Sequence, residues 1–157
     1  MNQAFHIENL HTEDREVIET IASWYNAAWG TPMEKTIRRL STYPSSDTLL
    51  QAVAYKNGAV IGSGGLCNTV NIYQVYPDLD KYGPWIALLY IQEDYRNQGA
   101  GQQILNFLEE AALRSGYPAL YLYTFTAERF YQRNGWKVIR EVRYKQEQTV
   151  IMKKTLL

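Results

Sequence analysis

The sequence predicts a mixed α/β fold in a single domain, and three observations lead to this prediction. Strand-like and helix-like segments follow one another in the order β-α-α-β-β-β-α-β-α-β-β, about seven strands and about four helices. Residues 84–91 form a continuous apolar run, typical of a strand buried on both faces. The 157 residues amount to about one domain, without a linker or an internal repeat. We therefore expect one domain spanning 1–157, with helices on the faces of a mixed sheet.

The N-terminal elements are a short strand at 4–8 and two helices. Apolar residues recur at helical spacing in the first helix, expected at about 13–28: Val17, Ile18, Ile21, Ala22, Trp24, Tyr25 and Ala28. Thr12 is its expected N-cap, and Gly30 is expected to end it. The second helix is expected at about 32–42.

A β-hairpin is expected next. The β-rich runs 48–56 and 59–67 flank Asn57-Gly58, a strong short-range hairpin signal. Three glycines in the second run predict a bulge or a close approach of another backbone: Gly62, Gly64 and Gly65.

After the buried run, a charged, glycine-containing turn leads into the second half of the chain. The elements expected there are a helix at about 100–115, a strand at 118–124, a short helix at about 127–134, and strands at 136–144 and 148–155. The edge of the last strand could pair with a second copy, which would give a homodimer.

Composition excludes several classes of function. The formal net charge is zero, so we expect neither a nucleic-acid partner nor a membrane partner. The chain lacks an apolar run of about 18 residues. Cys67 is the single cysteine, and we interpret it as a core residue. The sequence shows no signal-peptide pattern. These features predict a cytoplasmic protein. His6 and His11 lie apart from any cysteine or aspartate cluster, so no metal site is expected.

The residues between the buried strand and the next helix are suited to phosphate binding. The first turn of a helix leaves backbone N–H groups unpaired at its positive dipole end, and both effects stabilise a phosphate. In Arg96-Asn97-Gln98-Gly99-Ala100-Gly101, the two glycines let the backbone approach a pyrophosphate closely. Arg96 either adds a cation at the mouth or packs back to stiffen the turn. The segment is neither a Walker loop nor a dinucleotide fingerprint, and a lone Gly-x-Gly is often only structural.

A second motif gives this turn its context. Phe130-Tyr131-Gln132-Arg133-Asn134-Gly135-Trp136 follows later in the chain. Together the two motifs resemble those of the GNAT superfamily of N-acetyltransferases, Gln/Arg-x-x-Gly-x-Gly/Ala and Phe-Tyr-x-x-x-Gly-Phe/Trp. The resemblance is specific over about 84–140 and rests on element order over 1–83. It implies a GNAT-like, mostly antiparallel mixed sheet, splayed at its central strand.

The resemblance also implies a co-substrate and its site. Acetyl-CoA would lie in the gap beside the central strand, with its pantetheine arm on the backbone of Leu89, Tyr90 and Ile91. Its pyrophosphate would lie at the turn formed by Arg96, Asn97, Gln98, Gly99, Ala100, Gly101 and Gln102. A backbone N–H within Leu89–Ile91 would stabilise the oxyanion of the tetrahedral intermediate.

Tyr131 matches the tyrosine that protonates the departing thiolate in this superfamily. As one of 13 tyrosines, it could also be a plain aromatic of an amphipathic helix. No carboxylate occurs in the two expected central strands, so no general base is assigned. Asp78 and Asp80 could reach an acceptor or could be solvated turn residues.

The acceptor implied by the resemblance is a primary amine of unknown identity: a small amine, an antibiotic, or a protein amine. Aromatic candidates for its groove are Trp24, Trp29, Tyr73, Tyr76 and Trp85, although tryptophans on an apolar helix face are more often core residues. The reaction expected is direct transfer of the acetyl group within a ternary complex. The alternative is a non-catalytic CoA-binding or regulatory module with the same fold.

Overall fold

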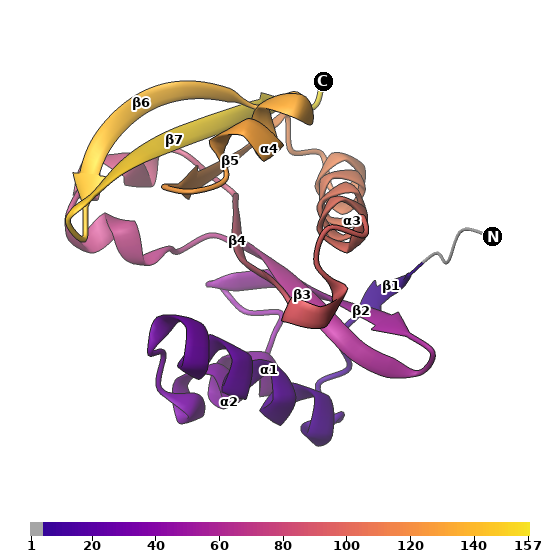
Figure 1. Cartoon of the computed structure of the whole chain (residues 1–157). Coiled ribbons are helices and arrows are strands. Elements are labelled where there is room, and N and C mark those ends of the chain that lie inside the picture. Colours follow the sequence, from indigo (N-terminus) through magenta and orange to yellow (C-terminus); the bar gives the residue numbers. More distant parts are fainter. Residues whose placement is uncertain (1–4) are drawn as a thin grey trace.

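A seven-stranded sheet in the order β1-β2-β3-β4-β5-β7-β6 organises the computed structural model, which describes residues 5–157 (Figure 1). Its strands are β1 (His6–Asn9), β2 (Thr48–Lys56), β3 (Ala59–Cys67), β4 (Trp85–Ile91), β5 (Ala119–Thr124), β6 (Lys137–Tyr144) and β7 (Glu147–Thr155). Only β4 and β5 are parallel, and the other neighbours are antiparallel. The predicted mixed, mostly antiparallel sheet is therefore confirmed.

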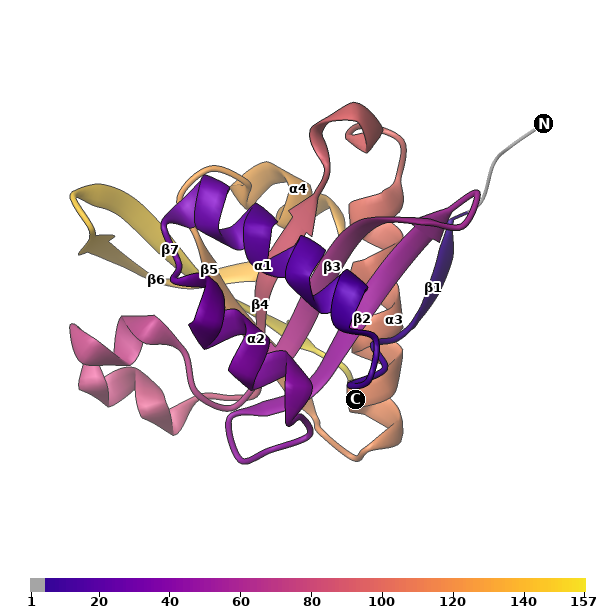
Figure 2. The same ribbon diagram turned by 90° about the horizontal axis from the view of Figure 1, so that it is seen from below.

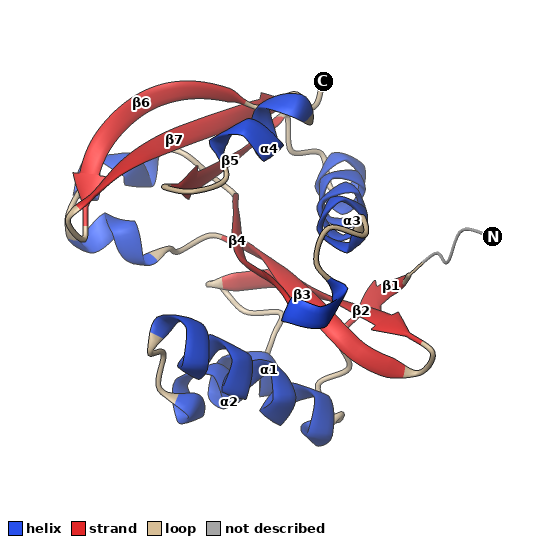
Figure 3. Ribbon diagram, in the orientation of Figure 1, coloured by secondary structure: helices blue, strands red, loops and turns tan. Residues whose placement is uncertain are grey.

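Helices cover both faces of this sheet (Figure 3). The helices are α1 (Arg15–Trp29), α2 (Met33–Ser41), α3 (Ala100–Arg114) and α4 (Glu128–Arg133), with 3₁₀ turns η1 (Asn71–Gln74), η2 (Pro77–Lys81) and η3 (Glu93–Tyr95). Figure 2 shows α1 and α2 across one face of β2–β4, with α3 behind the same strands. No helix in the described part of the chain has the length and apolar character needed to cross a membrane.

The ends of α1 follow from its sequence, with one correction. Gly30 ends the helix in a left-handed conformation with φ of 71° and donates its N–H to the Asn26 carbonyl, as predicted. The N-cap is Asp14 and not Thr12, because the Asp14 carboxylate accepts the Val17 N–H at 3.4 Å. The buried face of α1 consists of Ile18, Ile21, Ala22 and Tyr25.

The glycines of β3 allow α3 to pack closely on the sheet. A Cβ on Gly64 would lie 3.0 Å from Ile104 of α3, and one on Gly62 would lie 3.3 Å from the same side chain. Ile104 and its neighbours Leu105 and Leu108 are fully buried. The predicted bulge is observed beside Gly62, where Ile61 is the extra residue of β3 between the pairs Ala54 with Gly62 and Tyr55 with Val60. The neighbour from α3 at these glycines is a side chain and not a backbone, so the glycines also let the helix pack close to the sheet.

The predicted hairpin at Asn57-Gly58 is confirmed, since β2 and β3 pair antiparallel around it. The expected free edge at 148–155 is wrong. β7 pairs with β5 on one side and β6 on the other, so it has no open edge for a second copy. The expected strand at 4–8 is observed as β1, although residue 4 lies outside the described residues.

Candidate active site

A gap opens between the parallel strands β4 and β5. Their pairing consists of one residue pair, Trp85 at the start of β4 with Tyr121 in the middle of β5. Beyond it, the two halves of the sheet run apart (Figure 1). β4 therefore keeps backbone groups on its β5 side that no neighbouring strand takes up, as expected for a splayed central strand.

A bulge interrupts β4 beside this gap. Tyr90 pairs with Ser63 of β3 and Ala87 pairs with Gly65, so Leu88 and Leu89 together lie opposite one residue. Leu88 has φ of 61°, in the left-handed region that leucine seldom adopts. The Tyr25 hydroxyl donates to the Leu88 carbonyl oxygen at 2.6 Å.

The turn into α3 is open for a ligand. Gly99 is the N-cap with φ of 91°, and no side chain caps the helix. A Cβ placed on Gly99 would meet nothing within 4 Å, and one on Gly101 would meet only Ile91, at 3.9 Å. The unpaired N–H groups of the first turn therefore have access to an anion.

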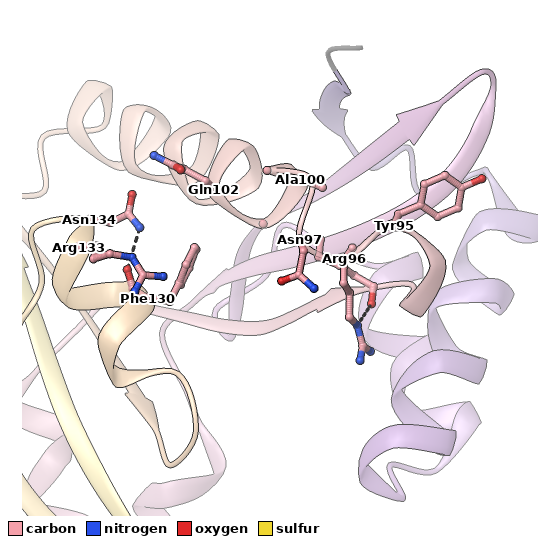
Figure 4. A pocket seen from close by; sticks show the side chains of 11 residues that line it. Tyr95, Arg96, Asn97, Ala100, Gln102, Phe130, Arg133 and Asn134 are labelled. Carbon is pink, nitrogen blue, oxygen red and sulfur yellow. Dashed lines mark hydrogen bonds between the residues drawn. The ribbon is translucent and has the colours of Figure 1, made fainter. Parts of the chain in front are cut away.

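A pocket of about 400 Å³ lies at this turn, between the start of α3 and α4. Figure 4 shows Ala100 and Gln102 on one wall and Phe130, Arg133 and Asn134 on the other. Its lining includes seven of the residues predicted to bind the cofactor: Ile91, Arg96, Asn97, Gly99, Ala100, Gly101 and Gln102. Leu89, Tyr90 and Gln98 do not line it. The Gln98 side chain instead bonds the Asp94 carbonyl oxygen and Lys56.

Arg96 packs back onto β4. Its Nε donates to the Ile91 carbonyl oxygen at 2.8 Å (Figure 4). Its guanidinium lies 5.2 Å from the centre of the Tyr90 ring. Of the two roles that the sequence allowed, the structure shows the stiffening one. Arg133 is a pocket cation that the sequence analysis missed. The sequence offered one indication of this role: Arg133 is a basic residue two positions after Tyr131, at a variable position of the second motif.

Tyr131 lies on α4, buried between aromatic neighbours. Its ring centre is 5.0 Å from that of Phe130 and 6.0 Å from that of Trp136. Burial raises the pKa of Tyr131 to about 12. Among residues 5–157 its hydroxyl has no hydrogen-bond partner, yet it is not closed off from solvent. A protonated phenol with a free donor is therefore available at neutral pH.

The rest of the second motif anchors α4 to the core. The indole N–H of Trp136 donates to the Glu109 carboxylate at 3.2 Å, and Lys154 bonds the same carboxylate at 2.7 Å. Lys154 also donates to the Asn134 carbonyl oxygen at 2.8 Å. Gly135 has φ of 92°, and a Cβ there would lie 3.3 Å from Lys154. The glycine and tryptophan of the motif thus fix the helix that carries Tyr131.

Comparison with known proteins decides the family. The family model described as an acetyltransferase (GNAT) domain matches residues 47–138, more than half of the chain. The chain belongs to this family. It is accordingly an acetyl-CoA-dependent N-acetyltransferase by family. No curated protein sequence matches it significantly.

Solved structures agree with the GNAT fold. An aminoglycoside 6'-N-acetyltransferase complexed with coenzyme A superposes with a TM-score of 0.75 at 13% identity, over 97% of each chain. The ribosomal-protein-S18-alanine N-acetyltransferase from Escherichia coli gives 0.73 at 16% identity, over 98% of this chain and 94% of that one. Ard1 from Thermoplasma volcanium superposes with a TM-score of 0.73 at 17% identity, over 98% of this chain and 99% of that one. At these identities the likeness establishes the fold alone.

Asp78, one of the two loop aspartates, is held in an ion pair. Asp78 of η2 forms an ion pair with Arg140 of β6 at 2.6 Å, and this pair lowers the pKa of the Asp78 carboxyl. A carboxylate held ionised by a guanidinium is a weak proton acceptor. Asp78 therefore ties η2 to β6, and it has neither the basicity nor the freedom of a general base.

The aromatic candidates separate into two groups. Trp85 is fully buried and donates its indole N–H to the Tyr73 hydroxyl at 2.7 Å, so it is a core residue. Trp24 and Trp29 instead surround Tyr90 of β4, with ring centres 5.4 and 6.0 Å from it. Trp29 is 48% exposed. Of these candidates, Trp29 therefore places exposed aromatic surface beside the bulged strand.

Proposed function

We propose that this GNAT domain transfers the acetyl group of acetyl-CoA directly to a primary amine in a ternary complex. The observation that carries the proposal is the pocket between the α3 start and α4, beside a bulged strand with unpaired backbone groups. The N–H groups of the α3 first turn bind the pyrophosphate, together with the backbone of residues 96–102.

The pantetheine arm pairs with β4. Gln92 donates its N–H to Ile61 of β3, and alternate residues of a strand direct their backbone groups to opposite edges. Tyr90 therefore faces β3, and Leu89 and Ile91 face the gap. The Leu89 carbonyl and the Ile91 N–H supply the backbone bonds to the pantetheine amides.

The chemistry follows from the groups around the thioester. The amine nitrogen attacks the carbonyl carbon, and a backbone N–H at the bulge stabilises the oxyanion. The C–S bond then breaks, the amine loses a proton to water, and Tyr131 donates its proton to the departing sulfur. Acetyl transfer requires no acyl-enzyme, and the buried Cys67 has its pKa raised by burial.

This buried, unpaired thiol also supports placing the enzyme in the cytoplasm.

Calorimetry with a pair of glycine variants tests the proposed site. Gly99→Glu puts a bulky anion where the pyrophosphate lies and should abolish micromolar binding of acetyl-CoA. Gly116→Glu is the matched control, since Gly116 has φ of 90° and also has open space around it, at the other end of α3. Equal affinity of both variants for acetyl-CoA would show that the pyrophosphate does not bind at this turn. No binding of acetyl-CoA by the wild type would refute the proposal.

Turnover distinguishes the enzyme from a non-catalytic CoA-binding module. The acceptors in the names of the related solved structures differ, an aminoglycoside in one and an alanine of ribosomal protein S18 in another. We therefore propose a panel of aminoglycosides, alkylamines and peptides with free N-termini, with release of the CoA thiol as readout. Thiol release that depends on one amine supports the enzyme, and its absence across the panel favours the module.

A further inference from the structure

A buried polar network lies between α1 and the bulge of β4. The Tyr25 hydroxyl donates to the Leu88 carbonyl oxygen and accepts from Gln51 Nε2 at 3.2 Å. Gln51 Nε2 also donates to the Ser63 hydroxyl at 2.7 Å, which donates to the Ala52 carbonyl oxygen at 2.8 Å. Tyr25, Gln51 and Ser63 have no exposed surface. Polar groups at such depth are costly unless each is bonded, so this arrangement is tightly specified.

The chain makes room for the centre of this network. A Cβ on Gly65 would lie 2.8 Å from Gln51 Oε1, so the absence of that Cβ creates the space for the carboxamide. Arg39 of α2 approaches the same oxygen at 3.5 Å. The carboxamide is therefore held at its oxygen and at its nitrogen, and it in turn orients the Tyr25 hydroxyl.

The network ends on the most unusual backbone in the strand. Leu88 is held at positive φ, a conformation that persists in a leucine only where the surroundings impose it. The peptide between Leu88 and Leu89 is trans, so its C=O and N–H point in opposite directions. Because Tyr25 takes the carbonyl on the α1 side, the Leu89 N–H is directed away from α1. Neither leucine is in register with β3, and the pairing of β4 with β5 is limited to Trp85.

We propose that Tyr25 is a positioning residue for the acetyl group. Supported by Gln51 and Ser63, it fixes the Leu88–Leu89 peptide so that the Leu89 N–H donates to the thioester carbonyl oxygen. The inference rests on the proposed function, since it requires acetyl-CoA beside β4. A donor already aligned with the oxygen that gains charge needs no reorganisation during the reaction. Tyr25 itself does not touch the reacting atoms.

Another tyrosine provides a matched control. Tyr43 is buried in the same apolar cluster as Tyr25, and its hydroxyl also donates to a backbone carbonyl, that of Leu10. That carbonyl lies outside β4. Tyr43→Phe and Tyr25→Phe each remove one buried hydroxyl bound to a main-chain oxygen, so a general loss of core stability should appear in both.

The experiment compares CoA with acetyl-CoA, because only the latter carries the carbonyl oxygen. Calorimetry should show that Tyr25→Phe binds CoA within about twofold of the wild type but binds acetyl-CoA about three- to tenfold more weakly. Tyr43→Phe should retain the wild-type ratio of the two affinities. With acetyl-CoA labelled with ¹³C at the carbonyl, the infrared stretch of the bound thioester should move to higher frequency in Tyr25→Phe alone.

Two failures can be told apart. If the wild type binds neither ligand, the proposed function is wrong and the inference falls with it. If the wild type binds both, and Tyr25→Phe keeps both the affinity ratio and the carbonyl stretch, only the inference is overturned. Should Tyr25→Phe not fold, Gln51→Met removes the support of the hydroxyl and should weaken acetyl-CoA selectively, and an unchanged ratio there would equally overturn it.

Discussion

At the scale of single residues, the surroundings of Tyr131 determine what it can do. Burial raises the pKa of Tyr131 to about 12, so the phenol keeps its proton at neutral pH. A higher pKa also makes it a weaker acid. A thiolate that departs beside Tyr131, as proposed, would form in the same apolar surroundings, and its own pKa would rise for the same reason. The phenol is thus matched to a desolvated thiolate better than to one in water.

Replacing this hydroxyl should affect the chemical step selectively. Tyr131→Phe is expected to lower kcat by about 100-fold while the Kd for CoA stays within about twofold, because a general acid acts mainly in the transition state. Steady-state kinetics with an acceptor from the panel, together with calorimetry, measures both. Tyr43→Phe again serves as the control. An unchanged kcat in Tyr131→Phe would show that another group or water protonates the sulfur.

The pH dependence of the wild type follows from the same pKa. Activity should rise with pH as the acceptor amine loses its proton, and it should not fall through ionisation of Tyr131 below about pH 11. The sign follows because the acid is active in its protonated form and its pKa is raised. Initial rates between about pH 6 and pH 10 check this. A decline centred near pH 9 that is absent from Tyr131→Phe would contradict it.

At the scale of elements, α4 depends on one partly buried ion pair. Glu109 of α3 and Lys154 of β7 are 2.7 Å apart, with side-chain exposures of 11% and 26%. Together with Trp136 they join α3, β7 and the end of α4. This contact holds α4, whose Phe130, Arg133 and Asn134 line the pocket at the α3 start, so α4 stability and pocket geometry are coupled.

Lys154→Met should therefore lower the free energy of unfolding by about 1–3 kcal/mol, because Glu109 would lose its cation while remaining mostly buried. Urea unfolding measures the difference. Lys153→Met is the matched control, since Lys153 is the preceding residue of the same strand and lies over the Tyr121 ring instead. Equal losses in both variants would mean that the ion pair contributes nothing specific.

Regular elements were predictable because periodicity reports burial, whereas the bulged, splayed central strand was implied only by the resemblance to the GNAT superfamily. The run 84–91 and the Asn57-Gly58 hairpin are observed as β4 and the β2–β3 pair. The bulge has no local signal, because a leucine at positive φ is imposed by tertiary contacts. In the sequence, Tyr25 is one more apolar position of a helix, yet its hydroxyl donates to the Leu88 carbonyl oxygen in that bulge. The sequence signals for the network are Gln51 and Ser63, two polar residues within buried strands.

At the scale of the whole molecule, the gap divides the sheet into two parts. β1–β4 form one part and β5–β7 the other, and the strands join through the single pair Trp85 with Tyr121. The pocket takes its walls from both sides, with β4 and the α3 start on one and α4 on the other. A CoA molecule bound there would bridge the two parts, so its binding energy should stabilise the molecule as a whole.

Hydrogen exchange with and without CoA should reveal this bridging. We expect slower exchange both in residues 89–102 and in residues 128–134, because a ligand held by both walls suppresses the local opening of each. Residues 15–41, on the opposite face, should change little. Gly99→Glu should lose the protection of both segments together, and Gly116→Glu should keep it. Protection confined to one segment would place the ligand against a single wall, and the gap would then be a feature of the fold without being the acetyl-CoA site.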